Sequence, residues 1–181
     1  MRKLVLLLAL CVTLPLHAAE AYKQIEWEAL VPKGWDPTQD LKVLLGSGKL
    51  KDSDPRAMDA LEKMKVLWDS APTEPSLAGA RIRLPGFAIP LEIKGGKVTE
   101  FLLVPYFGAC IHSPPPPANQ IIHVVSKKPL ANLHSMDTVW VSGTLSLQYA
   151  NTPWGSAGYR LTLDKMENYS PAPPKDGVRK R

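Results

Sequence analysis

The spacing of hydrophobic residues changes at Leu77, and this change constrains the fold more than any other feature of the chain. Before it, apolar residues recur every three or four positions, the period of one face of an α-helix, at Met58, Leu61, Met64 and Trp68. After it, apolar and polar residues alternate, which is the pattern of half-buried β-strands. The sequence therefore predicts a mainly β protein with an N-terminal helical segment, of the α+β class.

The helical segment carries its own boundary signals. Ser53 or Asp54 supplies an N-cap, and Pro55 stands near the first helical position, where its missing N–H has no intrahelical partner to lose. The helix is expected to end near Ser70, before the next prolines. A shorter helical piece is expected over residues 40–45, where a Gly-Ser-Gly run ends it.

The β segment divides into five expected strands. The first covers residues 81–93 with a bulge or kink at Pro85-Gly86, and Gly95-Gly96 predicts a hairpin turn into a second strand over 98–104. The middle of this second strand is apolar on both faces, so we expect it to be central and covered on both sides. The other strands are expected over 121–125, 139–147 and 159–163. Five short strands and one packed helix favour a small five-stranded OB-like barrel, with a β-sandwich as the alternative.

The first 21 residues have the composition of a secretory signal. Arg2 and Lys3 precede an apolar stretch that is too short to span a bilayer, and cleavage is expected after Ala18 or Ala21. A retained membrane anchor is the alternative. A lipoprotein is not expected, because Cys11 lies inside the apolar stretch and does not follow a small residue. We therefore expect an exported protein located in the periplasm.

Four regions are expected: a signal peptide over 1–21, a helical leader over 22–76 packed on the barrel, a barrel domain over 77–169, and a disordered basic tail over 170–181. The tail carries four basic residues and one acidic residue, so most of the net charge of +5 comes from it. The remaining body is too weakly charged to predict nucleic-acid binding. After signal cleavage no apolar stretch is long enough for stable membrane insertion.

The segment over 105–120 joins two apolar strands and is much longer than a hairpin needs. Its four successive prolines favour a stiff polyproline II rod. We expect Tyr106 and Phe107 to be core residues that anchor the base of this loop. The amides of Asn119 and Gln120 are expected to hold the loop backbone, with contact to a ligand as the alternative. The candidate binding residues of the loop are Tyr106, Gly108, Pro114, Pro115, Pro116, Pro117, Asn119 and Gln120.

These motifs together resemble the DUF3299 family of exported bacterial proteins. The resemblance covers about residues 22–169 and rests most on the Leu-Pro-Gly-Phe motif over 84–87 and on the string Tyr-Phe-Gly-Ala-Cys-Ile-His, four prolines and Asn-Gln over 106–120. Trp27, the Trp-Val-Ser-Gly-Thr-Leu motif over 140–145 and Gly158-Tyr159 also fit. The resemblance implies export from the cytoplasm and brings no established activity with it.

Cys110 and His112 are the best chemical candidates, because a thiolate and an imidazole two residues apart on an extended segment point to one side. Such ligands suit zinc or another soft metal, and His123 is a third candidate ligand, with His134 or Glu100 as a further one. The alternatives are that Cys110 is a buried packing residue, that it forms a nucleophilic pair with His112, or that it exchanges disulfides with a partner protein.

No phosphate loop, nucleophile elbow or zinc-protease motif occurs in the sequence. We therefore expect a non-enzymatic accessory protein of the cell envelope that binds zinc or another soft metal through Cys110, His112 and His123. The alternative is a metal-free interaction or scaffold module whose proline loop contacts an unknown envelope protein. Nucleic acid is not an expected partner.

Overall fold

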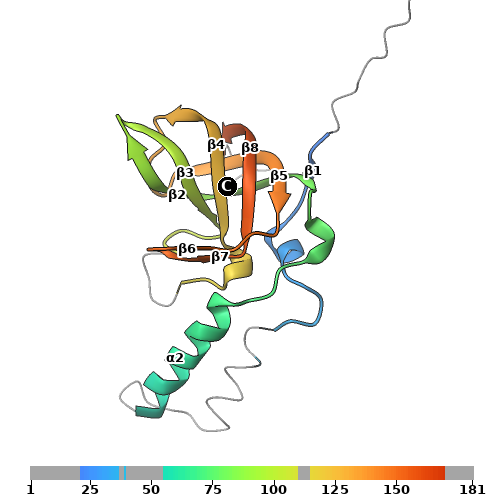
Figure 1. Cartoon of the computed structure of the whole chain (residues 1–181), viewed down its shortest axis with the longest axis vertical. Helices are drawn as coiled ribbons and strands as arrows, with labels where there is room; N and C mark the ends of the chain where they lie inside the picture. The colour runs from blue at the N-terminus through green and yellow to red at the C-terminus, as the bar shows by residue number, and fades with distance from the viewer. Residues whose placement is uncertain (1–20, 37–38, 40–54, 110–114, 170–181) are drawn as a thin grey trace, which may run out of the picture.

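A closed barrel of five strands forms the body of the protein in the computed structural model, which describes residues 21–36, 39, 55–109 and 115–169 (Figure 1). Each strand has the alternating or apolar pattern that the sequence predicts for it. The barrel strands are β2 (Arg81–Lys94), β3 (Lys97–Val104), β4 (Ile122–Ala131), β5 (Thr138–Ser146) and β8 (Tyr159–Asn168).

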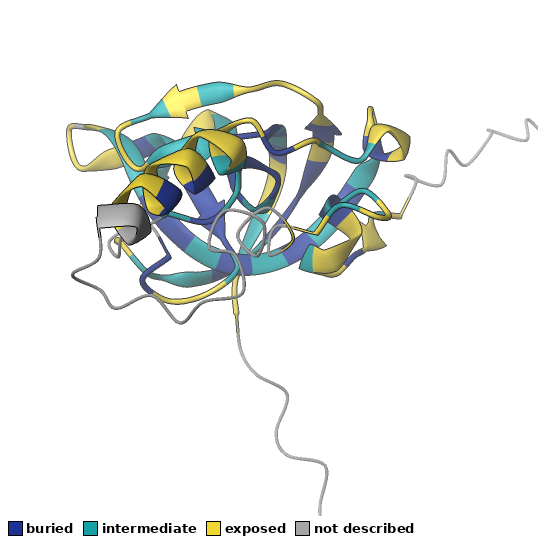
Figure 2. Ribbon diagram, turned by 90° about the horizontal axis from the view of Figure 1, so that it is seen from below, coloured by how far each residue is buried: buried dark blue, intermediate teal, exposed yellow. Residues whose placement is uncertain are grey.

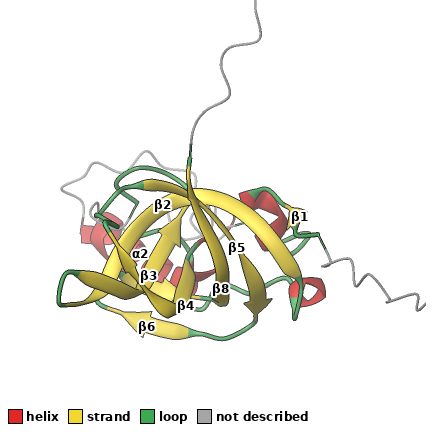
Figure 3. Cartoon of the chain, turned by 90° about the horizontal axis from the view of Figure 1, so that it is seen from above, coloured by secondary structure: helices red, strands yellow, loops and turns green. Residues whose placement is uncertain are grey.

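The strand order around the barrel is β2-β3-β4-β8-β5, and β5 pairs with β2 to close it. β4 and β8 run parallel, whereas the other neighbouring barrel strands are antiparallel. β2 curves across the barrel, so that its first half pairs with β5 and its second half with β3 (Figure 3). The predicted five-stranded OB-like barrel is confirmed, and the sandwich alternative does not apply.

Shorter elements surround the barrel. β1 (Lys23–Gln24) pairs in parallel with the start of β2, and β6 (Ala150–Thr152) forms a small hairpin with β7 (Gly155–Ala157). The described residues also form the short 3-10 helices η1 (Trp27–Leu30), η2 (Pro75–Leu77) and η3 (Ala118–Gln120).

The predicted helix is confirmed as α2 (Pro55–Asp69). Ala60 and Met64 are buried, whereas Met58 and Val66 are exposed. Figure 2 shows that α2 carries both buried and exposed positions. The helical spacing of Met58 therefore did not predict burial for it. The proposed cap residues and the helical piece expected over 40–45 lie outside the described residues. Within the described part of the chain, no helix is long and apolar enough to cross a membrane.

The core has two layers that β3 separates. Phe101 and Leu103 point into the barrel, whereas Leu102 and Val104 point outward and pack with Ala109 of the following loop. All four of these β3 side chains are fully buried, as expected for a strand covered on both sides. The loop therefore forms a second layer on the outer face of the barrel.

A bulge or kink is predicted at Pro85-Gly86, and β2 has no bulge there. β2 pairs with β5 without interruption through both residues, and the register shift lies instead around Glu92. Gly86 is required by a close approach: a Cβ there would lie 2.7 Å from Cγ of Leu103 and 2.9 Å from Cζ2 of Trp27. Glycine at this position lets the indole of Trp27 lie directly on the strand.

Candidate functional site

The leader is held on the barrel by hydrogen bonds from buried polar side chains. The hydroxyl of Tyr159 donates to the carbonyl of Leu30 over 2.6 Å and accepts from the amide of Glu74 over 2.6 Å. Burial raises the pKa of Tyr159 to about 12, because the phenolate would lose its hydration inside the protein. Tyr149 makes a similar contact by donating to the carbonyl of Ala71, and burial raises its pKa as well.

Asn119 and Gln120 belong to the same set of contacts. Nδ2 of Asn119 donates to the carbonyl of Pro72 over 2.9 Å, and Nε2 of Gln120 donates to the carbonyl of Trp27 over 3.0 Å. Oδ1 of Asn119 is buried without a hydrogen-bond partner among the described residues. Nε2 of Gln120 also donates to the carbonyl of Asn119 over 3.2 Å, so this amide binds backbone of its own loop, as expected, as well as backbone of the leader. The amide of Asn119 binds backbone of the leader.

Trp27, placed by Gln120, forms one wall of a cleft of about 230 Å³. Its indole Nε1 donates to the carbonyl of Pro85 over 2.8 Å, which fixes the ring plane over β2. We call this cleft the aromatic pocket and define it by all its lining residues: Trp27, Pro85, Gly86, Phe87, Pro105, Thr138 and Tyr169.

The rim of the aromatic pocket adds further aromatic surface. The ring of Phe107 packs edge-on against the ring of Phe87, with 5.9 Å between the ring centroids. Phe107 is 68% exposed. On the other side, the rings of Trp140 and Tyr169 lie 5.7 Å apart, and the guanidinium of Arg83 lies 4.3 Å above Trp140. The pocket lining itself places the rings of Trp27, Phe87 and Tyr169 beside Pro85 and Pro105. Together they make an apolar surface that is open to solvent at its edges.

Charged groups lie outside the pocket lining. The carboxylate of Glu167 forms two ion pairs: its Oε2 lies 3.5 Å from Nη2 of Arg83, and its Oε1 lies 3.0 Å from Nζ of Lys165. The hydrogen bond from Lys165 lowers the pKa of the Glu167 carboxyl, which keeps it ionised beside the arginine. The carboxylate thus holds Arg83 in position over Trp140.

The base of the loop differs from its prediction. Tyr106 and Phe107 are 53% and 68% exposed, so they are not core residues. Because the loop covers the outer face of the barrel, Ala109 fills the contact with β3 while the two rings remain at the surface. Gly108 is buried, with a φ of 80° that favours glycine, and its amide donates to Sδ of Met136 over 3.5 Å.

The proline run is described in part. Pro116 is buried, and Pro115 and Pro117 are partly buried, so none of these three prolines is freely displayed. Pro115 lies against Gly155 of β7, where an added Cβ would meet Cβ of Pro115 at 3.3 Å. Pro114, like Cys110 and His112, lies outside the described residues.

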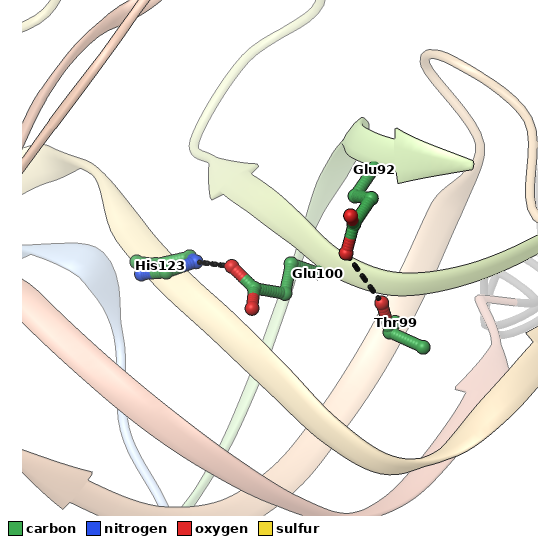
Figure 4. A network of polar contacts seen from close by, with 4 residues as sticks. All are labelled: Glu92, Thr99, Glu100 and His123. Carbon is green, nitrogen blue, oxygen red and sulfur yellow. Dashed lines mark hydrogen bonds and ion pairs between the residues drawn. The ribbon is translucent and has the colours of Figure 1, made fainter. Parts of the chain in front are cut away.

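Of the predicted metal ligands, the structure describes His123. Its Nε2 lies 2.9 Å from Oε2 of Glu100, and the imidazole is largely buried (Figure 4). His123 on β4 stands opposite Leu102 of β3, whose side chain points outward, so the pair lies on the outer face of the barrel. Thr99, the neighbour of Glu100 on β3, donates its Oγ1 hydroxyl to Oε2 of Glu92 on β2 over 3.3 Å.

The His123–Glu100 pair is not joined by a third ligand within the described part of the chain, where no group of three or more His, Cys, Asp or Glu side chains is suited to a metal ion. His134, the other candidate ligand, lies beside Asp137 instead, with 3.4 Å between its Nδ1 and Oδ2 of Asp137. What the described residues bring together is thus an imidazole and a carboxylate, which hold each other in place by a hydrogen bond.

Sequence reasoning missed the aromatic pocket. Its lining comes from the leader, from β2, from the start of the loop, from β5 and from the residue that follows β8. A sequence signal was present, because Trp27, the motif over 84–87 and Pro105 all belong to the family resemblance. Nothing in their spacing, however, shows that they meet.

Barrel, leader and aromatic pocket define a small β-barrel protein with a mostly apolar cleft at its surface. The family model described as "Protein of unknown function (DUF3299)" matches residues 27–168. The chain belongs to the DUF3299 family.

One solved structure agrees with this assignment. The crystal structure of a DUF3299 family protein from Pseudomonas aeruginosa PAO1 is 35% identical, with a TM-score of 0.64 over 83% of this chain and 97% of that chain. Asparaginyl-tRNA synthetase from Pyrococcus horikoshii, complexed with asparaginyl-adenylate, is 18% identical over 52% of this chain and 20% of that chain, with a TM-score of 0.32.

An OBody bound to hen egg-white lysozyme is 15% identical over 54% of this chain and 89% of that chain, with a TM-score of 0.34. At such TM-scores neither the synthetase nor the OBody bears on function. A comparison with curated proteins found no match.

Proposed function

We propose that this protein is a non-enzymatic interaction module that binds a proline-containing, extended segment of a partner protein in the aromatic pocket. The observation that carries the proposal is the lining itself: Trp27, Phe87 and Tyr169 beside Pro85 and Pro105. Aromatic-lined grooves are the usual docking surface for polyproline II segments, whose rigid backbone loses little entropy on binding.

The size of the pocket favours a peptide over a metabolite. Small-molecule sites usually enclose roughly 300–1,000 Å³. The aromatic pocket has about 230 Å³ and is open at its rim, where Phe107 is exposed. It therefore accommodates one or two side chains of a longer ligand that continues across the surface.

The pocket is also held in shape before any ligand arrives. Trp27 is fixed at its indole N–H by Pro85 and at its carbonyl by Gln120, and Gly86 brings it against β2. A rigid apolar wall lowers the entropy cost of binding. The indole N–H is already bonded, so shape and apolar contact set the affinity more than polar recognition does.

The proposal is tested with proline-containing ten-residue peptides and the chain from residue 22 onward, by fluorescence anisotropy. We expect micromolar binding by the wild type and a loss of about tenfold in Tyr169→Ala, since an aromatic anchor contributes roughly 1–2 kcal/mol. Trp154→Ala is the matched control, because Trp154 is similarly exposed (42% against 39% for Tyr169) and does not line the pocket. Equal affinity of both variants, or no binding to any peptide, would refute the proposal.

Export to the periplasm forms part of the same proposal, because the basic and apolar N-terminus has the form of a cleavable signal. The partner is then another protein of the cell envelope. Mass spectrometry of the protein from a periplasmic extract should find an N-terminus at Ala19 or Tyr22. Intact Met1 in a cytoplasmic fraction would contradict export.

A zinc site through Cys110, His112 and His123 is the second candidate function. The observation in its favour is that His123 is largely buried and held by Glu100 on the outer face of the barrel, against which Ala109, the neighbour of Cys110, is also packed. Metal analysis of the purified chain should find one zinc ion, lost in Cys110→Ser and His112→Ala. Absence of metal from the wild type after zinc dialysis would rule this site out.

A further inference from the structure

The described chain ends at one wall of the aromatic pocket. Tyr169 follows β8 directly, lines the pocket, and donates its backbone N–H to the carbonyl of Thr138 over 2.9 Å. Thr138 lines the same pocket. The point at which residue 170 leaves the barrel is therefore fixed at the edge of the cleft.

The residues that follow are rich in proline, like the external segment that we propose as the ligand of the pocket. The sequence after Tyr169 is Ser170-Pro171-Ala172-Pro173-Pro174-Lys175, with three prolines in six residues. Such a segment favours polyproline II geometry, with a rise of about 3.1 Å per residue. Four residues beyond Tyr169 reach roughly 13 Å at full extension, which is enough to turn and lie across the cleft beside their own attachment point.

We propose that residues 170–175 of the same molecule occupy the aromatic pocket, so that the tail competes with an external proline-containing ligand. This inference rests on the proposed function, because it assigns the pocket its intramolecular ligand. A short tether gives an effective concentration in the millimolar range, so even weak docking keeps the pocket partly filled. The tail then acts as a built-in competitor, and a partner must displace it.

The test uses the chain from residue 22 onward with Pro171, Pro173 and Pro174 all replaced by serine, and 5-fluorotryptophan as an NMR label. The five tryptophans give five signals, assigned by single replacements. Trp27 lines the pocket and Trp140 stacks on Tyr169, so their signals should shift in the serine variant. The signal of Trp154, on the β6–β7 hairpin, should not.

A matched control replaces Arg179, Lys180 and Arg181 by serine and keeps the prolines. We expect this control to resemble the wild type. A synthetic peptide of residues 170–181, added to the proline-to-serine variant, should return the Trp27 signal to its wild-type position. An external proline peptide should bind that variant about threefold to tenfold more tightly than it binds the wild type.

The outcomes separate this inference from the proposed function. If external peptides bind the wild type and the serine variant equally, and the Trp27 signal does not shift, the tail inference is wrong and the proposed function stands. If the tail peptide moves Trp27 but no external peptide binds, the proposed function and the competition are wrong, whereas docking of the tail in the pocket stands. A Trp27 shift that depends on protein concentration would mean exchange of tails between copies and would overturn intramolecular docking.

Discussion

The aromatic pocket and the His123–Glu100 pair are built on adjoining strands in opposite ways. The pocket takes residues from five separate segments, from Trp27 to Tyr169, and is mostly apolar. The pair needs only the register between β3 and β4 and consists of two titratable groups. The pocket is thus a property of the complete fold, whereas the pair is a local feature of two strands. Perturbing the fold should therefore affect the two regions unequally.

The largest difference is expected from Gly86→Ala. The new methyl group would meet Leu103, Trp27 and the carbonyl of Val104 at 2.7–2.9 Å, so the wall of the pocket must move. We expect a loss of about 2 kcal/mol in the free energy of unfolding and loss of peptide binding. Urea unfolding and anisotropy measure the two effects.

Gly34→Ala is the matched control for this variant, because nothing lies within 4 Å of its Cβ position. Its φ of 87° makes alanine unfavourable by about 1 kcal/mol, without any contact to the pocket. Peptide affinity should be unchanged. If Gly86→Ala bound peptide as well as Gly34→Ala does, the pocket wall would not depend on the close approach at Gly86.

The second prediction concerns alkaline pH. The pKa of Tyr159 is raised in the folded protein to about 12 from an ordinary value near 10, so the folded state favours the neutral phenol. Its stabilising contribution is complete below pH 10 and is lost as the pH rises toward 12. A shift of this size corresponds to about 2–3 kcal/mol. Urea unfolding between pH 8 and 12 measures the loss.

Tyr159→Phe separates this effect from general alkaline unfolding. The variant leaves the carbonyl of Leu30 and the amide of Glu74 without their partner, which should lower stability at pH 8 by about 1–3 kcal/mol. In return its stability should change less between pH 10 and 12. A wild-type curve parallel to that of the variant would assign the alkaline loss to other groups, such as Tyr149.

A smaller effect is expected from Gln120→Met, which keeps the length of the side chain and removes the donor to Trp27. Loss of this partly buried hydrogen bond should lower the free energy of unfolding by about 1 kcal/mol. Peptide affinity should fall a few-fold, because Trp27 loses one of its two supports. Affinity loss without any stability loss would instead indicate direct ligand contact by the amide.

The smallest effect is expected at the other region. Glu100 is 39% exposed, so solvent screens its interaction with His123, and Glu100→Gln should change stability by less than about 1 kcal/mol. Peptide binding should remain at the wild-type level. A marked loss of peptide affinity in this variant would couple the two regions and break the distinction between them.

Strand positions were predictable because each strand carries its own hydrophobic pattern. The strands predicted over 98–104 and 139–147 agree with β3 and β5 to within one residue, and the Gly95-Gly96 turn is where the sequence places it. Proline and glycine were less informative. Pro85-Gly86 predicted a bulge or kink from local rules, but β2 has no bulge there, and the glycine serves a contact with Trp27, a residue far away in the sequence.

The candidate site was predictable only in its parts. Trp27 and Phe87 belong to recognisable motifs, yet their meeting depends on the path of residues 22–36, which carry no periodic pattern. Tyr106 and Phe107 were expected in the core because aromatic residues are usually buried. The loop that carries them forms an outer layer, and hydrophobicity alone does not distinguish the inner from the outer face of a barrel.

The span of the aromatic pocket also bears on how the protein folds. A contact that joins Tyr159 to Leu30 spans 129 positions, and the pocket adds Tyr169 at the end of the described chain. Contacts of such long range close late, because the entropy of a large chain loop must be lost before they form. The β2–β3 hairpin can form early, whereas the pocket is complete only when the whole barrel is. Ligand binding to the pocket would therefore report the final step of folding.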